Sequence, residues 1–287
     1  MTETTAHDVV ACPLCGARDD EPVLHKDGFA IVRCRRCNLA YVNPRLSLPT
    51  LARLYGDQVI SPAAYYVRTE HADERSFADR IALIERWRRP GRLLDLGCGP
   101  GTFSAVARAR GWQTLGLDIN PTSVALCRER GLDVIAGTFP HHDLAGQRFD
   151  AIAMNDFLEH MAEPVVALKT ARELLGPGGV VFISTPDIGS LVARVTGEWW
   201  SHLKPNEHLI YFDRRTIRRL LEETGFRVEH VQSIGRLRNL GVAIEKIAAY
   251  GELPSRIARA IVPEWLADRV SLPINPGDEM AVVATAI

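Results

Sequence analysis

Three glycines at alternate positions, Gly97, Gly99 and Gly101, follow an apolar run that contains Asp95. Glycine lets the backbone turn tightly and lets a ligand approach without a Cβ atom in the way. A helix that opens at Thr102 then offers free N–H groups in its first turn. The succession of strand, glycine turn and helix predicts a cofactor-binding loop at the carboxyl end of a strand.

A second acidic residue, Asp118, lies near the end of the next apolar run, Thr114–Ile119. A carboxylate there can accept hydrogen bonds from both hydroxyls of an adenosine ribose. The alternative is that Asp118 only caps the following turn, but its distance from the glycine turn favours binding. A dinucleotide-dependent dehydrogenase is the rival class, and its G-x-G-x-x-G spacing requires a glycine where this chain has Thr102.

Four cysteines form two C-x2-C pairs, Cys12 with Cys15 and Cys34 with Cys37. Their spacing lies within the range of zinc ribbons, in which two tight turns each present two thiolates. Four thiolates leave no open coordination position, so the predicted Zn²⁺ is structural. Gly16 fits the expected positive-φ turn after the first pair, as Asn38 does after the second. The alternative is four buried thiols without metal.

Two histidines are candidate acid–base groups: His160, and His208 beside Glu207. Histidine suits proton transfer near neutral pH because its ordinary pKa lies near 6.5. We predict His208 as the general base, oriented by Glu207. His160 is the second candidate, with helix capping or packing as its alternative. An acidic substrate would need no base.

Short apolar runs alternate with helical stretches from Arg92 onward, which predicts βαβ units and an α/β fold with a mostly parallel sheet. Asn120 is the expected N-cap of one helix, and Asp213 that of another. The expected division of the chain is a zinc ribbon at 1–45, a helical connecting segment at 46–90 and a cofactor-binding domain at 91–287. Within the last, a helical insertion is expected at about 236–278.

The motifs together resemble the class I S-adenosylmethionine-dependent methyltransferases. The segment 95–101 is similar to their first motif, and Asp118 is similar to the acid of the second; 155–160 and 174–179 also fit the family. The resemblance implies a Rossmann-like seven-stranded sheet with helices on both faces and an antiparallel last strand at 280–287. It implies that S-adenosylmethionine contacts the following residues: Asp95, Gly97, Gly99, Gly101, Asp118, Ile119, Thr138, Phe139 and Asn155. The family often has Asp where this chain has Thr138.

The ribbon, the segment 41–45, Tyr65-Tyr66 and the segment 206–212 resemble a subgroup of methyltransferases of sugars and secondary metabolites. The deoxysugar C-methyltransferases of that subgroup have a similar Glu-His pair, but carry an additional C-terminal domain that this sequence lacks. We therefore expect methyl transfer to a hydroxyl, or to an activated carbon, of a small molecule, with a sugar or a secondary metabolite such as a polyketide as the expected acceptor. Trp199-Trp200 is expected either to stack on a ring of the acceptor or to pack in the core.

Charge argues against a nucleic-acid partner. The chain has a formal net charge of −1, and nucleic-acid binders usually show a basic excess. The two rivals to a small-molecule methyltransferase are an RNA or protein methyltransferase that docks its substrate on the ribbon, and a non-catalytic S-adenosylmethionine-binding protein. The sequence shows no signal peptide and no membrane-spanning run, so we expect a cytoplasmic protein. It makes no prediction of oligomeric state.

Overall fold

A seven-stranded sheet forms the centre of the protein in the computed structural model, which describes residues 7–56, 63–239 and 271–287. Its strand order is β12-β13-β10-β9-β6-β7-β8. The five neighbouring strands from β10 to β8 run parallel, and β13 is antiparallel to both of its neighbours. The predicted mostly parallel α/β sheet with an antiparallel last strand is therefore confirmed. The strands are β6 (Arg92–Leu96), β7 (Gln113–Asp118), β8 (Asp133–Ala136), β9 (Phe149–Asn155), β10 (Leu175–Pro186), β12 (Phe226–Asn239) and β13 (Ser271–Ala286).

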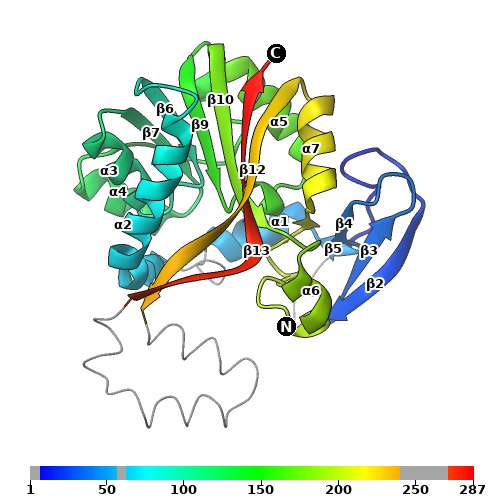
Figure 1. The fold of residues 1–287 in the computed structure, drawn as a ribbon. Coiled ribbons are helices and arrows are strands. Elements are labelled where there is room, and N and C mark those ends of the chain that lie inside the picture. The colour runs from blue at the N-terminus through cyan, green and yellow to red at the C-terminus, as the bar shows by residue number, and fades with distance from the viewer. Residues whose placement is uncertain (1–6, 57–62, 240–270) are drawn as a thin grey trace, which may run out of the picture.

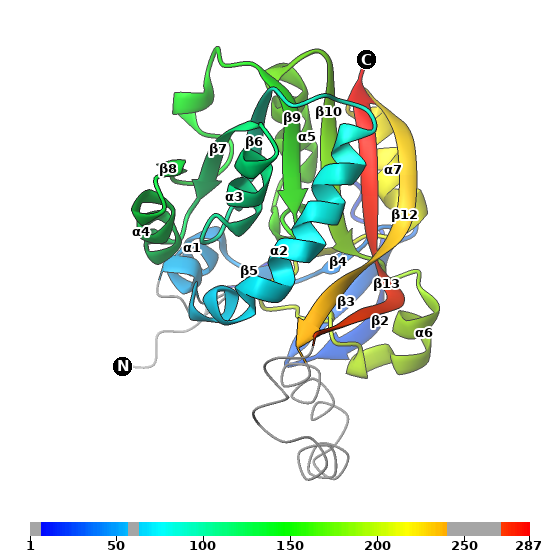
Figure 2. The ribbon, with the colours of Figure 1, turned by 60° about the vertical axis from the view of Figure 1, so that its left-hand side comes forward.

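Helices cover both faces of the sheet because successive strand residues point to opposite sides. Leu93 and Ala151 belong to the core under α2 (Ala63–Glu85) and α3 (Thr102–Ala109). Leu94 and Ile152, one residue further along their strands, belong to the core under α5 (Pro164–Leu174) and α7 (Arg214–Glu223). Figures 1 and 2 show these two helical layers on either side of the strands.

Side chains cap two helices as predicted. The Asn120 side chain accepts hydrogen bonds from the first turn of α4 (Pro121–Glu129), and Pro121 occupies its first position. Asp213 caps α7 in a capping box with Thr216. Both caps satisfy backbone N–H groups that a helix leaves without partners.

The N-terminal ribbon is tied to the rest of the chain by a shared sheet. Its order is β11-β4-β3-β2, formed by β2 (Asp20–Lys26), β3 (Phe29–Cys34), β4 (Ala40–Val42) and β11 (Ile210–Tyr211). The last strand comes from the segment after β10, and Ile210 pairs with Tyr41. A separate antiparallel pair joins β1 (His7–Asp8) to β5 (Arg45–Leu46). The segment that holds Glu207 and His208 is therefore fixed against the ribbon.

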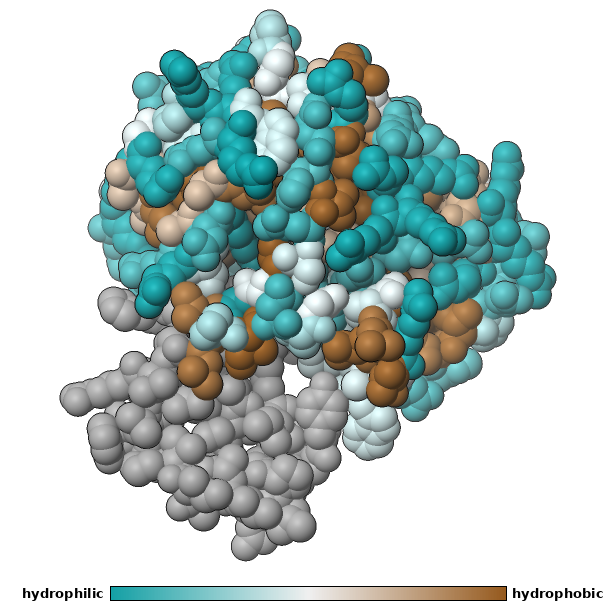
Figure 3. Space-filling view, in the orientation of Figure 1, coloured by the Kyte–Doolittle hydropathy of each residue, from teal (hydrophilic) through white to brown (hydrophobic). Residues whose placement is uncertain are grey.

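Short helices complete the described residues: α1 (Leu48–Gly56), α6 (Leu191–Thr196) and the 3-10 helices η1 (His142–Leu144), η2 (Leu158–His160) and η3 (Gly197–Trp199). Within the described ranges, every helix is too short or too polar to span a bilayer. Apolar side chains gather on the surface over α6 (Figure 3); the exposed ones in this part of the chain include Leu191, Val195 and Trp199.

The expected helical insertion at about 236–278 is wrong at both of its ends. Residues 236–239 belong to β12, and residues 271–278 belong to β13. Arg236 pairs with Ile274 in a two-stranded antiparallel extension of the sheet, which Figure 2 shows as a long arm. The remainder of the expected insertion, 240–270, lies outside the described residues.

Candidate functional site

The glycine turn leaves β6 and enters α3 with three left-handed residues. Gly97, Gly99 and Gly101 have φ angles of 69°, 51° and 83°, which favour glycine. A Cβ atom on Gly99 would meet nothing within 4 Å, whereas one on Gly97 would lie 2.6 Å from the ring of Phe157. The turn therefore packs closely against Phe157 at Gly97 and leaves open space beside Gly99.

Asp118 and the glycine turn are in direct contact. The N–H of Gly99 donates to Oδ2 of Asp118 at 2.8 Å, and the N–H of Asn120 donates to Oδ1 at 2.8 Å. Burial raises the pKa of the Asp118 carboxyl, and those backbone donors oppose the rise. A carboxylate has room for further donors beyond these two, so Asp118 remains able to accept ribose hydroxyls.

Asp95 lies at the base of the same turn. It is 1% exposed, and its Oδ2 atom accepts a hydrogen bond of 2.8 Å from the hydroxyl of Ser104. Burial raises the pKa of Asp95 to about 7; the Ser104 bond opposes the rise, and the charge of Asp118 adds to it. A cationic ligand group beside Asp95 would favour its ionised form.

One cavity of about 560 Å³ runs along this turn, within the size range of ligand pockets. Eight of the nine residues that the sequence assigns to the cofactor line it: Asp95, Gly97, Gly99, Asp118, Ile119, Thr138, Phe139 and Asn155. Gly101 does not line it. A Cβ atom there would lie 2.5 Å from Leu132 and 2.9 Å from the sulfur of Cys127, so Gly101 allows close packing at the start of α3.

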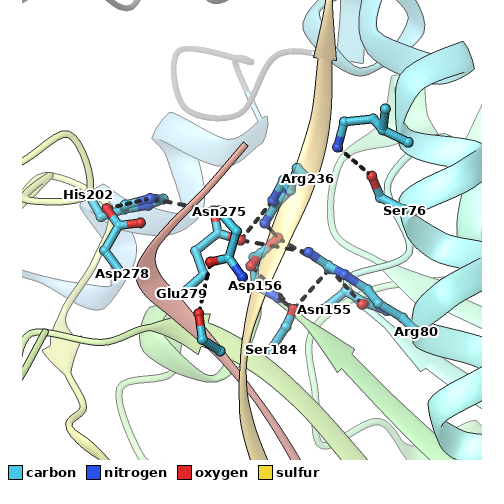
Figure 4. Close-up of polar contacts among 12 residues, drawn as sticks. Ser76, Arg80, Asn155, Asp156, Ser184, His202, Arg236, Asn275, Asp278 and Glu279 are labelled. Carbon is cyan, nitrogen blue, oxygen red and sulfur yellow. Dashed lines mark hydrogen bonds and ion pairs between the residues drawn. The ribbon is translucent and has the colours of Figure 1, made fainter. Parts of the chain in front are cut away.

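Asn155 and Asp156, at the end of β9, connect the cavity to a buried ionic network that the sequence did not reveal (Figure 4). Nη1 of Arg80 donates to Oδ1 of Asn155 at 2.9 Å, and Arg236 pairs with Asp156. Nε of Arg236 also donates to Glu279 at 2.9 Å. Burial alone would raise the pKa of Asp156, but the two guanidinium groups hold it well below its usual range.

These arginines come from helix α2 and from the β12–β13 extension, far apart in sequence. Asp156 itself has a φ of 48°, a left-handed conformation that is uncommon outside glycine. The position of Arg80 beside the apolar Ile81 and Ile84 was the available signal that it lies on the buried face of its helix. No sequence pattern pointed to Arg236, because the extension that carries it was expected to be helical.

The two predicted histidines, His160 and His208, differ in whether they reach the cavity. His160 lines the cavity, whereas Glu207 and His208 do not. His208 is 6% exposed and meets His160 edge to face, with 4.8 Å between ring centroids. Burial lowers the pKa of His160, and burial together with the neighbouring His160 lowers that of His208 further. Both shifts favour the neutral form of the ring.

Each of these rings has a backbone carbonyl on its Nδ1 atom. His160 Nδ1 lies 2.9 Å from the carbonyl oxygen of Glu207, and His208 Nδ1 lies 2.9 Å from that of His202. Because a carbonyl oxygen only accepts, we assign the proton of both rings to Nδ1. Nε2 then carries the lone pair. The hydroxyl of Tyr55, from α1, also contacts His160 Nδ1 at 2.8 Å. Glu207 thus orients His160 through its carbonyl group, rather than His208 through its carboxylate.

Neither tryptophan of the Trp199-Trp200 pair lines the cavity. Trp200 is 1% exposed and donates a hydrogen bond of 2.9 Å from Nε1 to Asp278, whereas Trp199 is 68% exposed. Core packing is therefore correct for Trp200. From the whole segment 199–212, only Leu209 reaches the cavity wall.

The four N-terminal cysteines converge. Cys12 and Cys37 sulfurs lie 3.4 Å apart, those of Cys15 and Cys34 lie 3.6 Å apart, and all four lie within 4.8 Å of one another. Zinc–sulfur bonds of about 2.3 Å in a tetrahedron place the sulfurs roughly 3.8 Å apart, so the group has the size of a Zn²⁺ site. The turns after the pairs have positive φ at Gly16 (70°) and Asn38 (65°), as predicted.

The sheet order, the glycine turn and the cavity beside Asp118 together define a class I S-adenosylmethionine-dependent methyltransferase. Residues 68–231, more than half of the chain, match the family described as "Methyltransferase domain". The chain belongs to this family, as the sequence motifs predicted.

Curated relatives include ubiquinone biosynthesis O-methyltransferases. The protein of that name from Cereibacter sphaeroides is 37% identical over 117 residues, which cover 38% of this chain and 47% of the relative. The one from Leptothrix cholodnii is 25% identical over 157 residues, which cover 50% of this chain and 67% of the relative. The chain thus spans about half the length of the first of these relatives.

Solved structures of methyltransferases share the fold. A possible histamine N-methyltransferase from Thermotoga maritima superposes with a TM-score of 0.56 at 18% identity, covering 82% of this chain and 99% of that one. The plantazolicin methyltransferase BpumL superposes with a TM-score of 0.55 at 11% identity, covering 82% and 93%. At these identities the likeness concerns the fold alone.

Proposed function

We propose that this protein transfers the methyl group of S-adenosylmethionine to a hydroxyl group of a small molecule. The observation that carries the proposal is the continuity of one cavity, which extends from the glycine turn and Asp118 to His160. A cofactor and an acceptor can therefore meet in a single space. The O-methyltransferase names of the curated relatives favour oxygen as the methylated atom.

At the cofactor end, the residues present fit S-adenosylmethionine. Gly99 leaves open space beside the turn, Asp118 offers its carboxylate to the ribose, and Asp95 offers a carboxyl to the methionine amino group. Phe139 and Thr138 line the cavity where the family places the adenine. Bound in this way, the cofactor supplies an electrophilic methyl group on a sulfonium.

The wall of the cavity as a whole is largely apolar. This favours an acceptor with a substantial apolar part, such as an aromatic or polyketide-like compound, over a bare sugar. Apolar residues of the wall outside the predicted cofactor contacts include Leu48, Leu51, Ala52, Phe157, Met161, Val166 and Leu209.

Catalysis requires the oxygen, the methyl carbon and the sulfur to lie in line, and positioning by the cavity supplies much of the rate. His160 is the histidine at the cavity wall, and its Nε2 lone pair is available because Nδ1 is held by the Glu207 carbonyl. We place activation of the acceptor hydroxyl at this ring, with His208 packed behind it. This differs from the sequence prediction, which favoured His208.

The cysteine cluster is proposed to hold one structural Zn²⁺. All four candidate ligands are sulfurs, which close a tetrahedral shell. Cys12, Cys34 and Cys37 belong to the same buried core as α7, so the metal would stabilise the packing of the ribbon on the methyltransferase sheet. Arg35 of the ribbon is paired at the surface with Asp19 and Glu21, which weakens the alternative of nucleic-acid docking.

The proposal is tested with the full chain and S-adenosylmethionine carrying a labelled methyl group. Label should pass to a panel of apolar phenols and hydroxylated polyketides, with S-adenosylhomocysteine formed in equal amount. Transfer to amines, RNA or protein but not to any hydroxyl compound would refute O-methylation. Absence of S-adenosylmethionine binding by calorimetry would refute the whole proposal.

A further inference from the structure

Three side chains that can bind a metal meet at His160, which lines the cavity, while the other two lie buried behind it. Glu159, His160 and His208 each offer one ligand atom, and these atoms lie within 4.8 Å of one another. The first two belong to η2 and the third lies just before β11. The backbone joins the segments directly, because the N–H of Leu209 donates to the carbonyl oxygen of Glu159 at 2.9 Å. The cluster is thus built into the fold.

Both imidazole rings are oriented as metal ligands usually are. A ligating histidine commonly donates its second N–H to a backbone carbonyl, which fixes the ring and its tautomer. His160 does this toward Glu207, and His208 toward His202, each at 2.9 Å. Two neutral rings in contact therefore both direct an unprotonated Nε2 away from their carbonyl partners.

Glu159 supplies the independent observation. It is 1% exposed, and its Oε2 atom accepts a hydrogen bond of 3.1 Å from Thr185. Among the described residues, its Oε1 atom is buried and has no hydrogen-bond partner. Leaving a buried polar atom unpaired costs about 1–3 kcal/mol, and more for a charged one. A protonated Oε1 would lack an acceptor just as an ionised one lacks a donor. A cation satisfies it.

We propose that Glu159, His160 and His208 bind a divalent transition-metal cation at the wall of the acceptor cavity. Two imidazoles and one carboxylate suit Zn²⁺, Mn²⁺, Fe²⁺ or Co²⁺ better than Mg²⁺, which prefers oxygen alone. Metal–ligand bonds of about 2.0–2.2 Å bring such atoms to roughly 3.4 Å from one another, so the side chains close in slightly on binding. Three protein ligands leave coordination positions open, as in catalytic sites, and His160 is the ligand that lines the cavity.

The consequence for the reaction rests on the proposed function. A hydroxyl bound to the cation has a lowered pKa, so it loses its proton to solvent water. The oxygen then bonds to the methyl carbon, the carbon–sulfur bond breaks, and its electron pair returns to sulfur as S-adenosylhomocysteine. The cation replaces a histidine base, and both histidines act as ligands. The cation also explains why neutral rings and a carboxyl are buried together beside a substrate cavity.

Binding is measured without any acceptor, by equilibrium dialysis of the full chain against Mn²⁺ and, separately, Co²⁺. The metal already held by the four cysteines is counted first, in protein as purified. We expect one further equivalent in the wild type. Glu159→Gln and His208→Asn should each weaken its binding at least tenfold. Affinity for S-adenosylmethionine, measured by calorimetry, shows whether each variant has kept its fold.

The matched control is His142→Ala. His141, His142 and Asp143 form another group close enough to hold a metal, and His142 and Asp143 are exposed. His142→Ala should leave the further equivalent unchanged. The inference is overturned if the wild type binds no further equivalent, if folded Glu159→Gln and His208→Asn bind as tightly as wild type, or if only His142→Ala loses the metal. In these cases a histidine base remains, whereas failure of methyl transfer to every hydroxyl compound would refute the proposed function and leave the binding result standing.

Discussion

The backbone N–H of Gly99 donates a 2.8 Å hydrogen bond to Oδ2 of Asp118. This bond connects the glycine turn after β6 to the acidic residue at the end of the neighbouring strand β7 without any cofactor. Asp118 also holds the N–H of Asn120, the N-cap of α4. The carboxylate therefore both presents itself to a ligand and fixes the loops on either side of it.

Asp118→Ala should weaken S-adenosylmethionine binding by at least tenfold. Hydrogen bonds to a charged acceptor are worth about 1.5–3 kcal/mol each, and the substitution also releases the N–H of Gly99. Calorimetry measures the affinity, with Asp133→Ala on the exposed start of β8 as the control. Equal affinity for Asp118→Ala and wild type would remove Asp118 from the cofactor site.

The pH dependence of cofactor binding should report on Asp95. Burial is the main cause that raises its pKa to about 7, from an ordinary value of 3.8. A cationic methionine amino group favours the carboxylate form, so affinity should rise between pH 6 and pH 8, by at most tenfold per pH unit. Asp95→Asn should flatten this dependence.

The ligand-free protein should show the opposite trend. Between about pH 4 and pH 7 the native state holds the Asp95 proton and the unfolded state does not, so this carboxyl makes stability fall as the pH rises. Denaturant titrations of wild type and Asp95→Asn at several pH values isolate this contribution. For cofactor binding, an affinity that depends on pH equally in wild type and in Asp95→Asn would contradict the assignment of the raised pKa to Asp95.

Local sequence signals predicted most of the fold and the cofactor end of the site. These signals are local: each depends on residues only a few positions apart, so its pattern can be recognised within one segment. They are the glycine turn, Asp118 and the helix caps Asn120 and Asp213. The acceptor end depends on contacts between distant segments. Nothing near His160 in sequence shows that Glu207 holds its ring, or that β11 pairs with the ribbon strand β4.

The same reason explains why the sequence favoured His208 over His160 as the general base, although His160 is the one that lines the cavity. His208 was favoured because it follows a carboxylate that seemed able to orient it. In the structure, the Glu207 carbonyl faces His160, and the Glu207 carboxylate pairs with Lys204. The sequence likewise did not predict the β12–β13 extension, because its two strands are separated by 31 residues, 240–270.

Zinc should be found at one equivalent in the ribbon of protein purified without added metal. Cys34→Ser should lose it, because three thiolates hold Zn²⁺ less tightly than four, and should lower the thermal stability of the chain. Cys127→Ser is the matched control; its sulfur lies 4.0 Å from that of Cys98, beside the glycine turn. Metal analysis that finds zinc unchanged in Cys34→Ser would disprove the site.

The two adjacent tryptophans should differ sharply in their effect on stability. Trp200→Ala removes a buried ring and its bond to Asp278, and should lower the free energy of unfolding by about 3–5 kcal/mol. Trp199→Ala changes an exposed side chain and should stay within about 0.5 kcal/mol of wild type. Denaturant unfolding measures both. Similar losses in the two variants would mean that Trp199 packs against something in solution.

His160→Ala should lower turnover by about 10²–10⁴-fold, the range for loss of a group that activates a nucleophile. His160 lines the cavity while its Nδ1 atom is held by Glu207, so its loss removes the activating group at the acceptor and leaves the cofactor turn intact. Affinity for S-adenosylmethionine should therefore stay within a few-fold of wild type.

The comparison with His208→Ala decides how the two rings share this role. If His160 alone acts on the hydroxyl, His208→Ala should lose less activity than His160→Ala, because His208 reaches the acceptor only through its neighbour. If both rings hold a cation, the two variants should lose activity to a similar extent, and the double variant should lose little more. His142→Ala changes an exposed side chain of η1 and should keep wild-type turnover. Wild-type turnover in both His160→Ala and His208→Ala, measured with a true acceptor, would leave positioning of the substrates as the sole source of catalysis.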